Sequence, residues 1–167
     1  MSDLIAFIGV GNMGNPMAIN LHKAGYKIKV FDISNETLKK AKEDGLETVE
    51  NIDELITKQT SVIITMLPEG KQSKQIYLGE NGIINRVSKQ CLLIDCSTID
   101  INTSKEIGKA AMDKQILMID APVSGGVMGA QKASLNIMVG GSTKAFEKAC
   151  PILKVLGKNI YHAGEIG

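Results

Sequence analysis

Short apolar runs alternate with amphipathic stretches along almost the whole chain. The runs predict buried strands, because a parallel strand that is covered on both faces is apolar at nearly every position. The predicted strands are residues 4–8, 28–32, 61–67, 91–96, 116–120, 135–139 and 159–162. Helical spacing of apolar residues predicts helices that end at Gly25, span 36–44, 51–58, 70–77, 82–87 and 102–113, and start at Ser142. Strands that alternate with helices are typical of a doubly wound, mostly parallel α/β sheet of the Rossmann type.

Polar residues mark the starts of several helices. Ser34, Asp100 and Ser142 are expected N-caps, because their side chains can accept a hydrogen bond from a free backbone N–H of the first turn. Pro151 lies well inside the last helical stretch. An interior proline loses a backbone hydrogen bond and clashes with the preceding turn, so we expect it to kink or split that helix.

A glycine-rich turn follows the first predicted strand, with the pattern G-x-G-x-x-G at Gly9, Gly11 and Gly14. Gly9 permits a tight turn, Gly11 lets the backbone approach a pyrophosphate, and Gly14 lets the next helix pack closely on the sheet. The helix N-terminus favours the phosphates. The second strand ends in Asp32, at the spacing where a carboxylate accepts hydrogen bonds from the adenosine ribose. The pattern predicts a bound dinucleotide.

Composition narrows the class of protein. The 167 residues are 44% hydrophobic and 22% charged, with a net charge of +1, which is typical of one ordinary globular domain. No basic stripe is interleaved with aromatic residues, so we expect no nucleic-acid partner. No apolar run approaches the roughly 20 residues of a spanning helix, and no signal peptide is evident. We therefore expect a cytoplasmic protein without a membrane partner.

The cysteines and histidines give no sign of catalysis. Cys91, Cys96 and Cys150 form no C-x-x-C pair and have no histidine nearby at metal-ligand spacing. We expect reduced core thiols, no metal site and a reducing compartment. His22 and His162 are expected to be structural or surface groups rather than catalytic bases.

Three further motifs follow the glycine-rich turn in a characteristic order. They are T-M-L-P from Thr65, D-C-S-T-I from Asp95 and D-A-P-V-S-G-G from Asp120. With G-V-G-N-M-G-N-P-M-A from Gly9, they resemble the β-hydroxyacid dehydrogenase family over essentially the whole chain. The resemblance implies NAD-linked oxidation of a short 3-hydroxy acid to its semialdehyde, with 3-hydroxyisobutyrate of valine catabolism as the favoured substrate.

The resemblance also implies roles for individual residues. The cofactor would be NAD, and its expected contacts are Gly9, Val10, Gly11, Asn12, Met13, Gly14, Asp32, Met66, Leu67, Pro68 and Thr98. The substrate carboxylate would be held by Ser124, Gly125 and Gly126, where small residues can expose backbone N–H groups beside one hydroxyl. Structural explanations stay open for these residues: a helix-capping acid at 32, a proline stop at 68, a helix cap at 98 and a plain Gly-Gly turn.

Asp32 favours NAD over NADP. A carboxylate near 4 Å from a 2′-phosphate, at an effective dielectric of about 20, costs roughly 4 kcal/mol for each pair of unit charges. Relatives that use NADP usually place an arginine just after this position, whereas this chain has Ile33, Ser34 and Asn35.

The family's catalytic lysine has no counterpart among these residues. It begins a long helix after the last strand of the first domain, and residues 162–167 resemble the approach to that helix, so the lysine is expected beyond Gly167. Lys158 lies on the wrong side of the last strand. The family's all-helical second domain is likewise absent. We expect residues 1–167 to be the NAD-binding portion of a longer, homo-oligomeric enzyme, and to be inactive alone.

Three alternatives remain open at this point. One is a related enzyme with the same motifs, such as a tartronate semialdehyde reductase or a γ-hydroxybutyrate-type dehydrogenase. Another is a non-catalytic nucleotide-binding module. A third is a methyltransferase, since that class also uses a glycine-rich first turn and an acid on the second strand.

Overall fold

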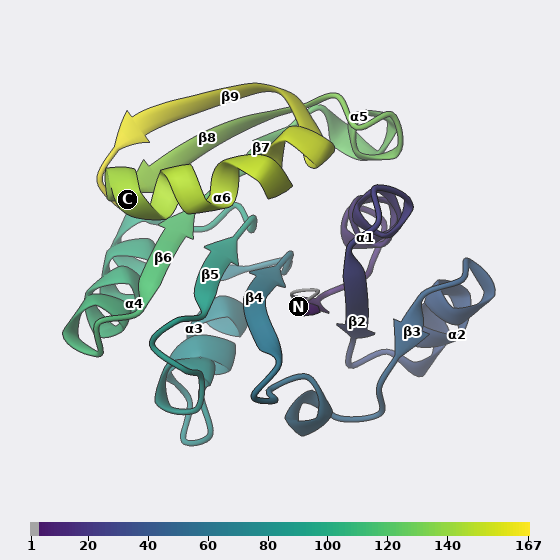
Figure 1. Cartoon of the computed structure of the whole chain (residues 1–167), viewed down its shortest axis with the longest axis horizontal. Coiled ribbons are helices and arrows are strands. Elements are labelled where there is room, and N and C mark those ends of the chain that lie inside the picture. Colours follow the sequence, from purple (N-terminus) through teal and green to yellow (C-terminus); the bar gives the residue numbers. More distant parts are fainter. Residues whose placement is uncertain (1–3) are drawn as a thin grey trace.

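The computed structural model describes residues 4–167, which form one sheet flanked by helices on both faces (Figure 1). The strand order is β3-β2-β1-β4-β5-β6-β8-β7, and β9 pairs with the other edge of β8. The strands are β1 (Leu4–Ile8), β2 (Lys27–Phe31), β3 (Glu47–Thr48), β4 (Thr60–Thr65), β5 (Leu92–Asp95), β6 (Leu117–Asp120), β7 (Val123–Ser124), β8 (Leu135–Gly141) and β9 (Gly157–Gly164).

Helices fill most of the connections between the strands. They are α1 (Gly14–Lys23), α2 (Asn35–Glu43), α3 (Gly70–Leu78), α4 (Ile101–Asp113), α5 (Gly126–Gln131) and α6 (Thr143–Leu156), with 3₁₀ turns η1 (Ile52–Glu54) and η2 (Ile83–Asn85). The expected N-caps are confirmed, since Ser34, Asp100 and Ser142 accept hydrogen bonds from the N–H groups of residues 37, 103 and 145.

The sheet is mostly parallel, as predicted. From β3 to β6 every neighbouring pair is parallel, whereas β8 runs antiparallel to β6 and β7. The strand order reverses beside β1, because the chain passes outward through β2 and β3 and then crosses to β4 on the other side of β1. In a doubly wound sheet, ligands bind at such a switch point, outside the carboxyl ends of the strands.

Two apolar cores cover the two faces of the sheet. Alternate residues of β1 point to opposite faces, so Ile5 and Phe7 join the core under α1, α2, α5 and α6, while Ala6 and Ile8 join the core under α3 and α4. This two-sided burial explains why β1 is apolar at every position. Figure 1 shows α3 and α4 together on one side of the sheet.

The predicted strands are confirmed to within two residues at each end, but the short elements are not. The two-residue strands β3 and β7 and the six-residue helix α5 were not predicted. Helices expected over 51–58 and 82–87 are single 3₁₀ turns, η1 and η2. These elements are too short for hydrophobic periodicity to define them.

Pro151 was expected to kink or split its helix, and the split is wrong, because α6 continues through this residue. The proline lies on the exposed face of α6. Ile152, Leu153 and Leu156 are buried in the core just after it and hold the last turn of the helix against the sheet. Tertiary packing therefore offsets the lost backbone hydrogen bond.

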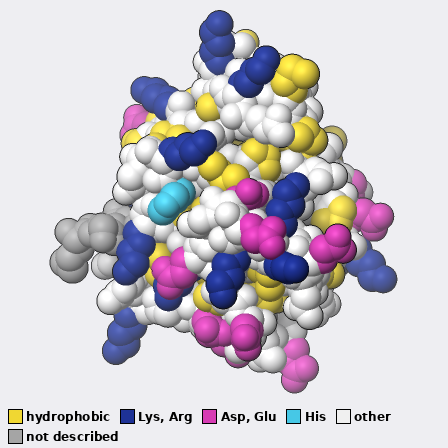
Figure 2. Space-filling model, turned by 90° about the vertical axis from the view of Figure 1, so that its right-hand side faces the viewer, with side chains coloured by type: hydrophobic (Ala, Val, Ile, Leu, Met, Phe, Trp, Pro, Cys, Tyr) yellow, Lys and Arg dark blue, Asp and Glu magenta, His cyan; other side chains and the backbone are white. Residues whose placement is uncertain are grey.

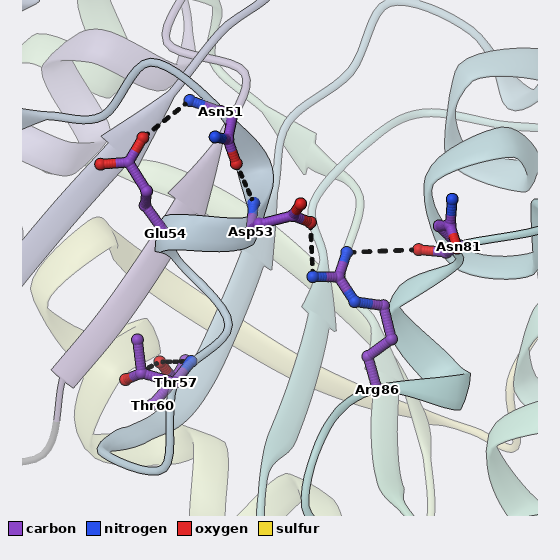
Figure 3. A network of polar contacts seen from close by, with 7 residues as sticks. All are labelled: Asn51, Asp53, Glu54, Thr57, Thr60, Asn81 and Arg86. Atoms are coloured by element: carbon purple, nitrogen blue, oxygen red, sulfur yellow. Dashed lines mark hydrogen bonds and ion pairs between the residues drawn. The ribbon is translucent and has the colours of Figure 1, made fainter.

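Side-chain hydrogen bonds organise the segments that lead into β4 and β5 (Figure 3). Asn51 and Glu54 form a capping box around η1, so the chain makes one tight turn there instead of a longer helix. Arg86 forms an ion pair with Asp53 and also donates to the carbonyl oxygen of Asn81. These contacts tie the two segments together.

The cysteines and His162 have structural environments. Cys91 and Cys96 are free and buried, as expected, while Cys150 is free but only partly buried. Burial raises the pKa of the Cys91 thiol to about 12 and that of Cys96 further, so both stay protonated at neutral pH. His162 stacks on Phe146 with the ring centroids 4.5 Å apart.

The surface carries charges of both signs. On the face shown in Figure 2, lysine and arginine side chains are interspersed with aspartate and glutamate. No helix formed by residues 4–167 combines the length and apolar composition that crossing a bilayer requires.

Candidate functional site

A cleft of about 600 Å³ opens at the switch point of the sheet, and its walls come from the ends of β1, β2 and β4 and from the helices that follow them. Its size is within the usual range for a cofactor site. The residues that line it are Ile8, Gly9, Gly11, Asn12, Met13, Gly14, Phe31, Asp32, Ile33, Thr37, Met66, Leu67, Pro68, Gln72, Gln75 and Ile76. Nine of the eleven residues expected to contact NAD are among them, and Val10 and Thr98 are not.

The three glycines of the first turn have different physical roles. Gly9 has a φ of +91°, and a Cβ there would collide with the Met66 carbonyl oxygen. A Cβ at Gly14 would collide with the Gly9 carbonyl oxygen, so this glycine permits the close packing of α1 on the turn. A Cβ at Gly11 would meet nothing within 4 Å. Gly11 is therefore not required by the fold, and it leaves open space beside the backbone where a diphosphate can approach.

The N-terminus of α1 suits an anion. No side chain caps it, and its first turn contains no acidic residue. The free N–H groups and the positive end of the helix dipole are therefore available to a ligand in the cleft. With the open space at Gly11, this arrangement fits a nucleotide diphosphate.

Asp32 joins the first turn to the end of β2. Its Oδ2 accepts a hydrogen bond from the Val10 N–H at 2.9 Å, and its Oδ1 accepts one from the Ser34 N–H at 3.0 Å. A carboxylate can accept about four hydrogen bonds, so acceptor sites remain for ribose hydroxyls. Val10 itself is 1% exposed and its N–H is taken by Asp32, so this residue shapes the turn rather than lining the cleft.

The opposite wall of the cleft is the segment after β4. Leu67 donates its N–H to the Ser97 hydroxyl at 2.8 Å, which fixes this segment to the loop after β5. Thr98 follows Ser97 and is exposed. Thr98 does not cap α4, because that position is taken by Asp100, so the cap explanation for Thr98 is wrong.

A buried polar network beneath this wall was not found by sequence reasoning. Asp95 is 1% exposed, and its Oδ1 accepts hydrogen bonds from the Thr65 hydroxyl at 2.9 Å and the Ser97 N–H at 3.0 Å. The Thr65 hydroxyl also lies 2.8 Å from the buried Tyr77 hydroxyl. One sequence signal could have revealed this network. Asp95 is the only charged residue in the apolar run 91–96, and the preceding predicted strand contains Thr65 close to its end.

Burial governs the ionisation of this network. It raises the pKa of Asp95, although hydrogen bonds from Ser97 and Thr65 partly oppose the shift. Burial also raises the pKa of Tyr77, and the nearby Asp95 carboxylate adds to that effect. Asp95 Oδ2 has no hydrogen-bond partner among residues 4–167, which further disfavours the charged form.

The expected substrate segment lies beside the cofactor turn but outside the main cleft. Ser124 is exposed in β7, and Gly125 and Gly126 have φ values of +135° and +61° before α5. The positive φ values mean that the Gly-Gly turn is also a structural requirement.

A second hollow places α5, the helix that follows this segment, near the glycine-rich turn. It measures about 330 Å³ and brings Gly11 and Asn12 together with Val127 and Gln131 of α5. The helix that follows the expected substrate-binding segment therefore lies beside the expected cofactor-binding turn.

These features define a dinucleotide-binding domain of the Rossmann type, and a comparison with known families makes the assignment specific. A family model described as the NAD binding domain of 6-phosphogluconate dehydrogenase matches residues 4–164. The chain belongs to this family of NAD-binding domains, within the β-hydroxyacid dehydrogenases, and its cofactor is NAD.

Individual relatives agree with this assignment. The chain is 43% identical to the 3-hydroxyisobutyrate dehydrogenase of Pseudomonas aeruginosa over 98% of its own length and 54% of the relative. It is 39% identical to the NAD-dependent L-serine dehydrogenase of the same species, with the same coverage. The solved structure of Mycobacterium tuberculosis 3-hydroxyisobutyrate dehydrogenase with L-serine matches with a TM-score of 0.92 at 36% identity, covering 99% of this chain and 56% of that one. The chain spans about half the length of the curated relatives it matches.

Substitutions at Gly11 and Gly14 should separate binding from folding. We expect Gly11→Ala to leave the free energy of unfolding within about 1 kcal/mol of wild type, since the space is open and Ala replaces Gly at little cost. It should raise the Kd for NAD at least tenfold, about 1.4 kcal/mol, by filling the diphosphate position. Gly14→Ala should destabilise the fold by about 2 kcal/mol or more. Urea unfolding measures the free energy of unfolding, and calorimetry measures the Kd for NAD. An unchanged Kd in Gly11→Ala would contradict this position of the diphosphate.

The buried Asp95 should make stability depend on pH. Because its pKa is raised in the folded state, folding takes up a proton between the pKa of an unfolded aspartate, about 3.9, and the folded value. Wild type therefore loses stability as pH rises through that window. Asp95→Asn does not titrate, so its free energy of unfolding relative to wild type should increase with pH. Urea unfolding between about pH 4 and about pH 8 tests this, and a constant difference would show that Asp95 is ionised in the folded protein throughout.

Proposed function

We propose that this chain holds NAD in the cleft at the β1/β4 switch point and supplies the cofactor half of an enzyme that oxidises 3-hydroxyisobutyrate to its semialdehyde. The observation that carries the proposal is the combination, in one cleft, of an uncapped helix N-terminus, the open space at Gly11 and the Asp32 carboxylate. Each suits a different part of the dinucleotide. The similarity to proteins named 3-hydroxyisobutyrate dehydrogenase supports the choice of reaction.

The proposed binding mode runs along the cleft from β2 to β4. The ribose of the adenosine half bonds to Asp32, and Ile33, which is 87% exposed and lines the cleft, offers an apolar surface to the adenine. The diphosphate lies at Gly11 and the start of α1. Leu67, Pro68 and Thr98 would hold the nicotinamide half, which would supply the hydride acceptor for the reaction.

The proposed substrate contacts are Ser124, Gly125 and Gly126. The hydroxyl and the backbone N–H groups of this segment would hold the substrate carboxylate, and they lie on the α5 side of the glycine-rich turn. In this proposal the carboxylate binds next to the cofactor rather than inside the dinucleotide cleft.

A second candidate substrate is L-serine. One relative is named an NAD-dependent L-serine dehydrogenase, and the matching Mycobacterium tuberculosis structure has L-serine in its title. L-serine and 3-hydroxyisobutyrate share a carboxylate and a hydroxyl on carbon 3, and they differ in the group on carbon 2. The substrate segment proposed here recognises only the shared carboxylate, so other groups must distinguish the two.

The acid-base group is proposed to come from outside residues 1–167. No lysine of the described chain lines the cleft. Without a group to take the hydroxyl proton, the reaction loses the roughly 10²- to 10⁴-fold that acid-base catalysis contributes. The non-catalytic module remains the alternative from another class, while the family match leaves the methyltransferase without support.

Turnover measurements test the proposed function. We expect the 167-residue chain to bind NAD but to oxidise 3-hydroxyisobutyrate at least about 100-fold more slowly than the Pseudomonas aeruginosa relative, for lack of the acid-base group. A chimera that joins this chain to the part of that relative which it does not cover should restore activity. Substantial turnover by the chain alone would refute an external acid-base group. A chimera that binds NAD yet oxidises neither 3-hydroxyisobutyrate nor L-serine would favour the non-catalytic module.

The choice of NAD over NADP should depend on Asp32. Asp32→Asn removes the negative charge that repels a 2′-phosphate, so the ratio of the Kd for NADP to the Kd for NAD should fall at least about tenfold. Glu43→Gln, which removes a similar charge from the far end of α2, is the matched control and should leave the ratio unchanged. Calorimetry with both cofactors measures the ratio, and equal effects of the two substitutions would show that net charge alone sets it.

A further inference from the structure

Five polar side chains are buried together directly beneath one wall of the cleft. Thr65, Ser73 and Tyr77 are 0% exposed, Asp95 is 1% exposed and Ser97 is 2% exposed. Thr65 and Asp95 are register partners at the ends of the neighbouring strands β4 and β5. Burying so many polar groups is costly unless they are paired, and apolar residues fill the rest of this region of the core. The cluster therefore calls for an explanation beyond packing.

The hydrogen bonds of the cluster have a definite direction. A threonine hydroxyl has one proton, and the Thr65 hydroxyl donates it to Asp95 Oδ1 at 2.9 Å. The Tyr77 hydroxyl, 2.8 Å from Thr65 Oγ1, must then be the donor in that pair. Ser97 donates its N–H to the same Asp95 oxygen at 3.0 Å. Asp95 is thus the common acceptor of two branches, one from α3 and one from the loop after β5.

Both branches end at the cleft. On the loop side, the Ser97 hydroxyl accepts the N–H of Leu67, which lines the cleft. On the helix side, Tyr77 follows Ile76, and α3 contributes Ile76 and Gln72 to the same wall. Asp95 therefore connects the two parts of the wall that lies opposite Asp32. Among residues 4–167, the adenosine end of the cleft makes no hydrogen bond to this network.

We propose that Asp95 is a positioning residue which, through Thr65, Tyr77 and Ser97, holds the wall that contacts the nicotinamide half of NAD. The network then contributes to binding of that half and not of the ADP-ribose half. This inference rests on the proposed placement of NAD along the cleft. Buried residues that touch no ligand would then affect the binding of only one end of the cofactor.

ADP-ribose, which is NAD without its nicotinamide, separates this role from a general structural one. If the network only stabilises the fold, loosening it affects both ligands alike. If the network positions the wall opposite Asp32, loosening it raises the Kd for NAD and leaves the Kd for ADP-ribose largely unchanged. The ratio of the two dissociation constants is therefore a measure that loss of stability alone does not move.

The decisive substitution is Thr65→Val, which keeps the shape of the side chain but removes its hydroxyl. We expect it to raise the Kd for NAD about tenfold and the Kd for ADP-ribose less than about twofold. Thr65→Ser, which restores the hydroxyl, should return the ratio toward that of wild type. The matched control is Thr60→Val at the opposite end of β4, where a buried hydroxyl donates to the Leu55 carbonyl oxygen away from the cleft. Figure 3 shows Thr60 beside Thr57, whose N–H it accepts. It should leave the ratio unchanged even where it lowers stability.

Ser97→Ala provides a second route if Thr65→Val does not fold, because it removes the acceptor of the Leu67 N–H and the hydroxyl contact to Asp95, but keeps the backbone N–H that donates to Asp95. It should shift the ratio in the same direction. Equal weakening of NAD and ADP-ribose by these variants, or a shift with Thr60→Val as large as theirs, would overturn the inference. Failure of this inference can be told apart from failure of the proposed binding mode. If the binding mode is wrong, Gly11→Ala, with the Asp95 network intact, should leave the Kd values for NAD and ADP-ribose unchanged.

Discussion

The close approach of α1 to the end of β1 is the constraint on which the site depends. Gly14 must lack a Cβ because the Gly9 carbonyl oxygen occupies that space, and Gly9 must be glycine because the turn needs a positive φ against Met66. This packing aims the uncapped helix N-terminus at the cleft. Gly11 differs, since the fold makes no demand on it. The same motif therefore contains two glycines that build the turn and one that keeps space for a ligand.

The two walls of the cleft are held by different physical means. On the adenosine side, Asp32 accepts N–H groups from the turn and from the start of α2 at a partly exposed position. On the other side, Asp95 collects hydrogen bonds in a dry environment, where each one is electrostatically stronger and each unpaired group costs more. Each side of the switch point thus has a carboxylate at the end of a strand. Asp32 is accessible to a ligand, whereas Asp95 is buried.

Much of the fold was predictable because buried strands and capped helices leave strong local patterns. β1, β4 and β5 read as apolar runs, and Ser34 and Asp100 marked helix starts. The continuity of α6 through Pro151 was not predictable, because the packing of this helix on the sheet outweighs the local effect of the proline. In the site, the glycines and Asp32 were predictable from spacing, whereas the Asp95 network was not, since its partners come from three separate elements that only the fold brings together.

The amide of Asn20 gives the two ligand segments a shared mechanical support. It donates from α1 to the Ala130 carbonyl oxygen of α5 at 2.7 Å, so a hydrogen bond joins two helices that are far apart in sequence. The first begins at the glycine-rich turn and the second begins just after Gly125. The starts of the two ligand segments therefore sit on helices that are joined directly, and not only through the sheet between them.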